Sequence, residues 1–206
     1  DLPQVLVSEA AHAHEHSLEV QLPFLQSVFD DFSLLPLAVG RASPEQVAEV
    51  LERLWGGEET LIVVSSDLSH YLPYADAQIT DSETVQRILD LDPTVRHEEA
   101  CGATPINGLL LAAQRHGLQA SLVDLRNSGD TAGDKARVVG YAAFAFTASE
   151  TDSDTLGPTL LTIARNALNQ HFSLPTHPVT PHPALALPAA TFVTLTQAGN
   201  LRGCIG

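Results

Sequence analysis

An uninterrupted apolar run at residues 61–64, Leu-Ile-Val-Val, constrains the fold more than any other feature of this sequence. Three of its four residues are β-branched, a composition typical of a strand that is buried on both faces of a sheet. The run ends in the polar segment 65–71, Ser-Ser-Asp-Leu-Ser-His-Tyr. Open α/β sheets bind their ligands just beyond the carboxyl ends of such strands. The segment therefore fits two interpretations, a ligand-binding loop or a polar turn that caps the next element.

The pattern around this run predicts an α/β fold with a mixed, largely parallel sheet flanked by helices. Before the run, short strands are expected at residues 5–7 and 34–39, separated by an apolar pattern of helical spacing. Residues 43–46, Ser-Pro-Glu-Gln, have the composition of a helix capping box with proline at the first helical position. After the run, the periodicity predicts helices over 82–91 and from 105 onward, and strands over 118–125 and 138–146.

The charge balance excludes some classes of partner. The 206-residue chain carries 25 Asp and Glu against 10 Lys and Arg, a formal net charge of -15, and has no basic block. A nucleic acid or an anionic membrane surface is therefore not an expected partner, and no apolar run is long enough to span a bilayer. Cys101 and Cys204 are far apart in the sequence, which favours a reducing, cytoplasmic setting. We interpret the chain, which has no methionine and no signal peptide, as an internal piece of a longer protein.

Two further positions carry side chains suited to chemistry. His16 directly precedes a helical apolar pattern, and a helix amino end would keep its imidazole neutral, able to act as a base or a ligand. Cys101 lies just ahead of the helix predicted from residue 105, where a thiolate is stabilised. The alternative for Cys101 is a small buried hydrophobe, and the pattern alone leaves both interpretations open. The neighbouring Gly102 allows a close approach of the backbone or an unusual φ.

Near residue 149 the character of the sequence changes. Residues 149–156 are polar and acidic without a periodic pattern, and they are predicted to form a linker. Beyond them we expect a helix with an apolar stripe over 160–168, a strand over 191–195, and a glycine-punctuated strand over 201–206.

Three motifs together resemble the Memo family, in the order in which that family carries them. They are residues 15–24 (Glu-His-Ser-Leu-Glu-Val-Gln-Leu-Pro-Phe), 65–71, and 101–106 (Cys-Gly-Ala-Thr-Pro-Ile). The resemblance implies a Memo-like domain over residues 1–148. It also implies a fold similar to that of the class III extradiol ring-cleaving dioxygenases, which use a non-haem metal in an α/β scaffold.

The resemblance implies roles for particular residues. His70 and Cys101 match metal-pocket positions, and Asp67 lies close to both in the family pattern. His16 matches a second-sphere acid/base histidine of the ring-cleaving enzymes, so His16, Asp67 and His70 are the expected catalytic residues. A histidine, a thiolate and a carboxylate suit iron, copper or zinc. The chain departs from the pattern in two ways: two further histidine ligands would precede residue 1, and a thiolate replaces a carboxylate ligand.

The segment 157–206 resembles the start of an α+β AMMECR-type domain, chiefly through the motif Leu-Arg-Gly-Cys-Ile-Gly at 201–206. Such a fusion is similar to the microbial AmmeMemoRadiSam system, which implies a radical-SAM protein as partner. The expected function is a metal-dependent, dioxygenase-related oxidoreductase acting on a small molecule or a peptide. The alternative is a non-catalytic binding or adaptor module that serves the radical-SAM partner.

Overall fold

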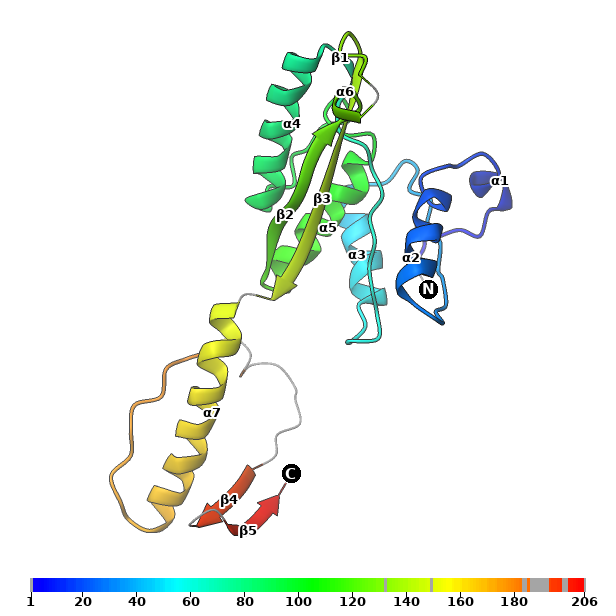
Figure 1. Cartoon of the computed structure of the whole chain (residues 1–206). Coiled ribbons are helices and arrows are strands. Elements are labelled where there is room, and N and C mark those ends of the chain that lie inside the picture. The colour runs from blue at the N-terminus through cyan, green and yellow to red at the C-terminus, as the bar shows by residue number, and fades with distance from the viewer. Residues whose placement is uncertain are drawn as a thin grey trace. The chain divides into compact units, whose positions relative to one another are not determined.

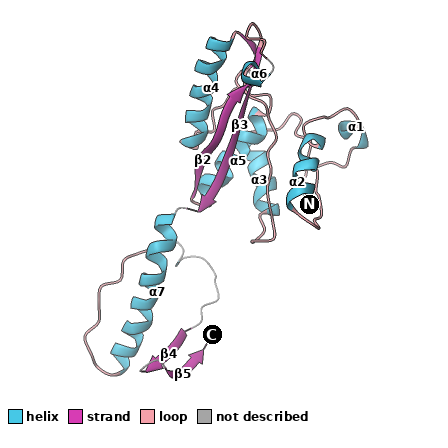
Figure 2. Cartoon of the chain, in the orientation of Figure 1, coloured by secondary structure: helices cyan, strands magenta, loops and turns pink. Residues whose placement is uncertain are grey.

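The computed structural model describes residues 2–131, 133–148, 150–182, 185, 193–197 and 200–205 (Figure 1). The chain divides into two compact units, Asp1–Thr147 and Ala148–Gly206. Figure 2 shows helices and strands interspersed in the first unit. Its elements are α1 (Glu9–His12), the 3-10 helix η1 (Glu19–Gln21), α2 (Leu22–Val28), α3 (Pro44–Leu54), β1 (His70–Leu72), α4 (Tyr74–Leu89), α5 (Ala103–Arg115), β2 (Leu118–Asn127), α6 (Ser128–Thr131) and β3 (Val138–Ala148).

The sheet of the first unit has the strand order β1-β3-β2 in the described part of the chain. β1 pairs with β3 in antiparallel fashion, and Figure 1 shows β2 and β3 running in opposite directions. The prediction of a largely parallel sheet is therefore wrong. The connection between β2 and β3 is short and contains α6 in its described part. A short connection joins antiparallel neighbours, whereas parallel strands need a long crossover.

The apolar runs at 5–7, 34–39 and 61–64 were the basis of the parallel prediction, and none of them is a strand in the structure. Leu6, Leu35 and Leu61 are exposed in these three segments. An apolar run indicates a strand only if a neighbouring strand accepts its hydrogen bonds, and the described residues supply no such neighbour here. Regular pairing begins instead around residue 68, where Leu68 N donates to the Gly140 carbonyl over 2.9 Å.

The helices lie where the sequence pattern predicts them, except that α4 begins at Tyr74, eight residues before the predicted start at 82, and ends at Leu89. α3 begins at Pro44 with the predicted capping box: the Ser43 hydroxyl accepts from the Gln46 backbone N–H, and the Gln46 side chain accepts from Ser43 N. α5 begins at Ala103, with Gly102 as its N-cap residue. α3 packs against α5. At their contact, a Cβ on Gly108 would lie only 2.4 Å from Val47 Cγ1, so the glycine allows the two helices to approach closely.

The core of the first unit joins α4, α5 and the sheet. Its buried members come from both helices and from the two loops that precede β1 and α5. Partly buried side chains of β2 and β3 pack against this cluster. The core thus fixes the ends of the two loops that carry the predicted site residues. The buried members are Leu68, Val85, Ile88, Val95, Ala100, Ala103, Ile106 and Leu110.

The second unit contains α7 (Glu150–His171) and an antiparallel pair, β4 (Val193–Gln197) and β5 (Asn200–Ile205). Residues 150–156, part of the expected linker, belong to α7, which begins at Glu150 and includes Pro158; the role of 149–156 as a linker between domains stays a prediction. The strands agree in place with the predicted ones, whereas the side chains of Arg202 and Cys204 lie outside what the structure describes. The AMMECR-type identity of this unit stays a prediction. No helix in the described ranges has both the length and the apolarity needed to cross a membrane.

Candidate metal site

Asp67, His70 and Cys101 come together where the segment that leads into β1 meets the loop before α5. A carboxylate oxygen, an imidazole nitrogen and the sulfur of these residues all lie within 4.8 Å of one another. Asp67 Oδ2 is 3.5 Å from His70 Nε2. The side chains of Asp67 and His70 are 48% and 34% exposed, and Cys101 is exposed. The site is therefore open to solvent.

Backbone contacts between two loops place Cys101 beside Asp67. Cys101 N donates to the Asp67 carbonyl over 3.3 Å, and Asp67 N donates to Cys101 Sγ over 3.4 Å. The Ser66 hydroxyl accepts from Gly102 N over 2.8 Å. A Cβ on Gly102 would lie 2.7 Å from Ser66 Cβ, so only glycine fits at this crossing. The predicted close approach at Gly102 is thus confirmed.

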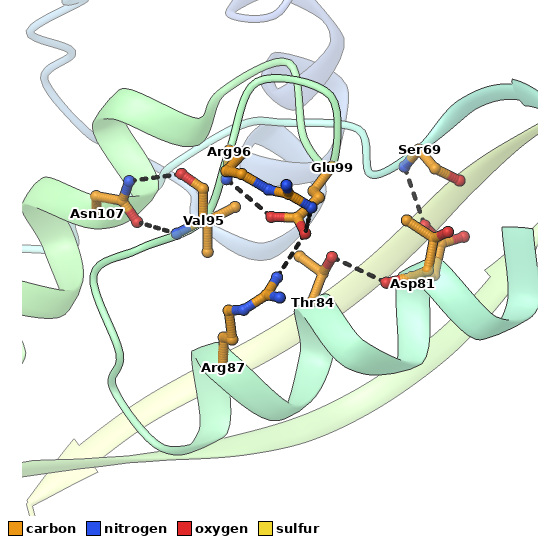
Figure 3. Close-up of polar contacts among 9 residues, drawn as sticks. Ser69, Asp81, Thr84, Arg87, Val95, Arg96, Glu99 and Asn107 are labelled. Atoms are coloured by element: carbon orange, nitrogen blue, oxygen red, sulfur yellow. Dashed lines mark hydrogen bonds and ion pairs between the residues drawn. The ribbon is translucent and has the colours of Figure 1, made fainter.

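His70 is the first residue of β1, and the backbone before it is anchored on two sides. Gly140 N donates to the Ser69 carbonyl over 2.9 Å, which joins the segment to β3. Ser69 N donates to Oδ1 of Asp81 on α4 over 3.0 Å (Figure 3). Asp81 is only 2% exposed, and its carboxylate fills the space that a Cβ on Gly140 would need. Strand β3 and helix α4 together therefore fix the position of the backbone at His70.

An ion network holds the loop that leads to Cys101. Glu99, which is 2% exposed, lies between two arginines (Figure 3). Arg87 of α4 donates to it over 2.6 Å, and the Arg96 side chain donates over 2.8 Å. Asn107 of α5 holds the same loop, because its amide both accepts from Val95 N and donates to the Val95 carbonyl. These contacts tie the Cys101 loop to both helices.

The arginines also set the charge state of Glu99. Hydrogen bonds from Arg96, with a smaller contribution from Arg87, hold the pKa of the Glu99 carboxyl at about 2, against an ordinary value of 4.5. Burial acts in the opposite direction but is the weaker effect overall. Glu99 is therefore ionised at neutral pH and acts as a buried anion that two cations neutralise.

The structure does not bring His16 into this group of three. Its side chain is 81% exposed, and its Nδ1 lies 3.2 Å from Glu19 Oε1. The segment that carries His16 nevertheless reaches the loop, because the Gln21 side chain donates to the Ser65 hydroxyl over 2.9 Å. The acid/base role of His16 stays a prediction.

The donor set suits a transition metal. Zinc takes sulfur at about 2.3 Å and nitrogen or oxygen at about 2.0–2.2 Å, so two tetrahedral ligands are about 3.5 Å apart. The atoms of Asp67 and His70 already have that spacing. Cys101 Sγ would need to move about 1 Å closer to the Asp67 and His70 atoms, which rotation of an exposed thiol allows. One sulfur, one nitrogen and one oxygen ligand leave open coordination positions, as in catalytic metal sites.

Sequence reasoning missed the residues that support this site. Asp81 and Glu99 are buried acids, and in the sequence they look like ordinary charges on a solvated helix and loop. The one available signal was the position of Glu99 two residues before Cys101. Ser66 lies in the polar segment 65–71, and nothing in the sequence indicates that its hydroxyl joins the two loops.

Comparison with known proteins agrees with the motifs. Residues 3–145 match the family model described as Memo-like protein. A MEMO1 family protein of Methanosarcina barkeri is 41% identical over 151 residues, covering 66% of this chain and 57% of that protein. A MEMO1 family protein of Archaeoglobus fulgidus is 36% identical over 159 residues, covering 70% of this chain and 60% of that protein. A MEMO1 family protein of Metallosphaera sedula is 35% identical over 153 residues, covering 68% of this chain and 54% of that protein.

The matched region contains the whole candidate site. Asp67, His70 and Cys101 all lie within residues 3–145. The chain spans only a little over half the length of the curated relatives that it matches. The match to the family model covers well over half of the chain, and the relatives agree with it. The chain therefore belongs to the Memo family.

Proposed function

We propose that the first unit binds a divalent or redox-active transition metal at Asp67, His70 and Cys101 and supports metal-dependent, oxidoreductase-related chemistry on a small molecule or a peptide. The observation that carries the proposal is that an oxygen, a nitrogen and a sulfur donor converge from two separate segments of the chain. Asp67 and Cys101 are 34 residues apart in the sequence. A structural turn needs no such convergence. Iron, copper and zinc are the metals that this donor set suits.

Each residue has a distinct part in the proposal. Cys101 supplies a soft thiolate, which favours copper(I) or zinc and changes the redox behaviour of iron. His70 supplies a neutral nitrogen, and Asp67 supplies an anionic oxygen, which lies 3.5 Å from Nε2 of that ring. A bound metal would supply Lewis-acid or redox chemistry at the open positions. His16, on the segment tied to Ser65, is proposed to move protons at this site.

The experiment is metal binding by the full chain under anaerobic conditions. Iron(II), copper(I) and zinc(II) are each added to protein freed of metal, and the bound metal per chain is measured after gel filtration. We expect one equivalent in the wild type and a loss of at least tenfold in affinity in Cys101→Ser and His70→Ala. Cys204→Ser is the matched control, because it removes the other cysteine of the chain, which is not one of the three proposed ligands.

Turnover separates the enzyme from the adaptor alternative. The metal-loaded protein is tested for oxygen consumption with candidate reductants, beside Cys101→Ser. Metal binding without any turnover would favour the binding or adaptor module. No stoichiometric metal in the wild type, together with no effect of Cys101→Ser, would remove the proposal altogether. The AMMECR-type identity of residues 157–206 and the radical-SAM partner remain part of the proposal, carried by the motif at 201–206.

A further inference from the structure

Tyr71, the residue that follows His70, has a backbone conformation that tyrosine rarely adopts. Its φ angle is +60°, in the left-handed region. Only glycine, and to a lesser extent asparagine and aspartate, enters this region readily, and for other residues the conformation is strained. Burial does not offset this strain, because Tyr71 is 61% exposed. A strained, exposed aromatic residue beside a candidate metal ligand needs an explanation other than core packing.

The strain arises from a β-bulge between His70 and Leu72. His70 pairs with Val139 and Leu72 pairs with Val138, so Tyr71 is one residue in excess on β1. An extra residue of this kind re-aims the side chains that flank it. The backbone before His70 cannot absorb the change, because Ser69 is hydrogen-bonded to β3 on one side and to α4 on the other. Tyr71 alone takes up the distortion.

The Tyr71 ring lies between His70 and Arg137. Its centroid is 5.8 Å from that of the His70 imidazole, with an interplanar angle of 67°, which is the edge-to-face arrangement. The guanidinium carbon of Arg137 lies over the Tyr71 ring, 4.8 Å from the ring centroid, in a cation–π contact. Arg137 thereby restrains a ring that would otherwise turn freely in solvent, and the restrained ring in turn limits the rotation of His70.

We propose that Tyr71 is a positioning residue of the metal site: its ring, held in a strained bulge and covered by Arg137, restricts the His70 imidazole to the orientation in which Nε2 faces Asp67. This inference rests on the proposed metal site. It explains why a strained tyrosine stands where glycine would be more stable. Residues that orient metal-binding histidines typically change metal affinity by 10–100-fold when they are replaced.

The test compares the stability of the metal-free protein with its affinity for cobalt(II). A merely structural role of Tyr71 would change both in the same direction. Stability of the metal-free full chain is followed during heating by the fluorescence of Trp55, the one tryptophan of the chain. Affinity is measured with cobalt(II) alone, whose thiolate charge-transfer absorption also reports on Cys101. Tyr71→Gly keeps the bulge and removes both the strain and the ring. We expect the melting temperature of the first unit to rise by about 2–4 °C, while cobalt binds about tenfold more weakly.

Two more variants complete the experiment. Tyr71→Phe keeps the ring, and both properties should stay as in the wild type. Tyr71→Asn also tolerates a positive φ and controls for the extra backbone flexibility of glycine. It should bind cobalt as weakly as Tyr71→Gly does. Unchanged cobalt affinity in both ring-free variants, or a parallel fall in stability and affinity, would overturn the inference alone. A wild type that binds no cobalt would overturn the proposed metal site and the inference with it.

Discussion

Glu99 offers the sharpest test of how the Cys101 loop is held. In Glu99→Gln the buried anion disappears while Arg87, whose side chain is 29% exposed, and Arg96 remain. The pKa of Glu99 falls from an ordinary 4.5 to about 2 in the folded protein, a difference of about 2.5 units. At about 1.4 kcal/mol per unit, ionised Glu99 contributes on the order of 3 kcal/mol to the free energy of unfolding. Breaking a buried ion pair by removing one partner costs a similar amount, about 3–5 kcal/mol.

The assay is urea denaturation followed by Trp55 fluorescence, at pH 7 and at steps down to pH 2.5. Glu99→Gln should lose about 3 kcal/mol at pH 7. Because the folded pKa is the lower one, the contribution of Glu99 is complete above about pH 4.5 and declines as the pH falls toward 2. The wild type should therefore lose stability across that window, and Glu99→Gln should lose correspondingly less.

Glu98→Gln is the matched control, since Glu98 is the exposed neighbour of Glu99. It should change the free energy of unfolding by less than about 0.5 kcal/mol. The reasoning is refuted if Glu99→Gln loses no more than this control at pH 7, or if its stability falls with pH as steeply as that of the wild type.

Three further predictions, two on packing and one on a helix cap, use the same urea assay. Gly108→Ala should destabilise the first unit by about 1–3 kcal/mol, because the new Cβ meets Val47, and a gain in stability would contradict the close contact of α3 with α5. Ser43→Ala should cost about 1 kcal/mol through loss of the capping box with Gln46, whereas an unchanged midpoint would show that the box is dispensable. Leu110→Ala, at a fully buried position, should cost about 2–5 kcal/mol, and a loss below 1 kcal/mol would place Leu110 outside the core.

Local chemistry made the helices and two of the site loops predictable. The capping box at Ser43 defines the start of α3, and Gly102 marks both the start of α5 and a close crossing of loops. Such signals depend on neighbours in sequence, so periodicity and cap residues are enough to find them. The same reasoning placed Asp67, His70 and Cys101 near ends of elements, and the family motifs joined them into one site.

Strand pairing and the support of the site could not be read in this way. The run at 61–64 has the composition of a buried strand, but pairing depends on which strands lie beside it. The left-handed Tyr71 arises from the register between β1 and β3, a long-range property that no local signal encodes. Glu99 looks like any surface carboxylate until Arg87, twelve residues earlier, folds against it.

X-ray absorption at the zinc edge of the zinc-loaded full chain tests the central claim most directly, because it counts the ligands by type. The account predicts one sulfur at about 2.3 Å with nitrogen and oxygen at about 2.0–2.2 Å. It also predicts loss of the sulfur signal in Cys101→Ser and its retention in Cys204→Ser. A spectrum without sulfur, or one that Cys101→Ser leaves unchanged, would contradict a metal site built on Asp67, His70 and Cys101.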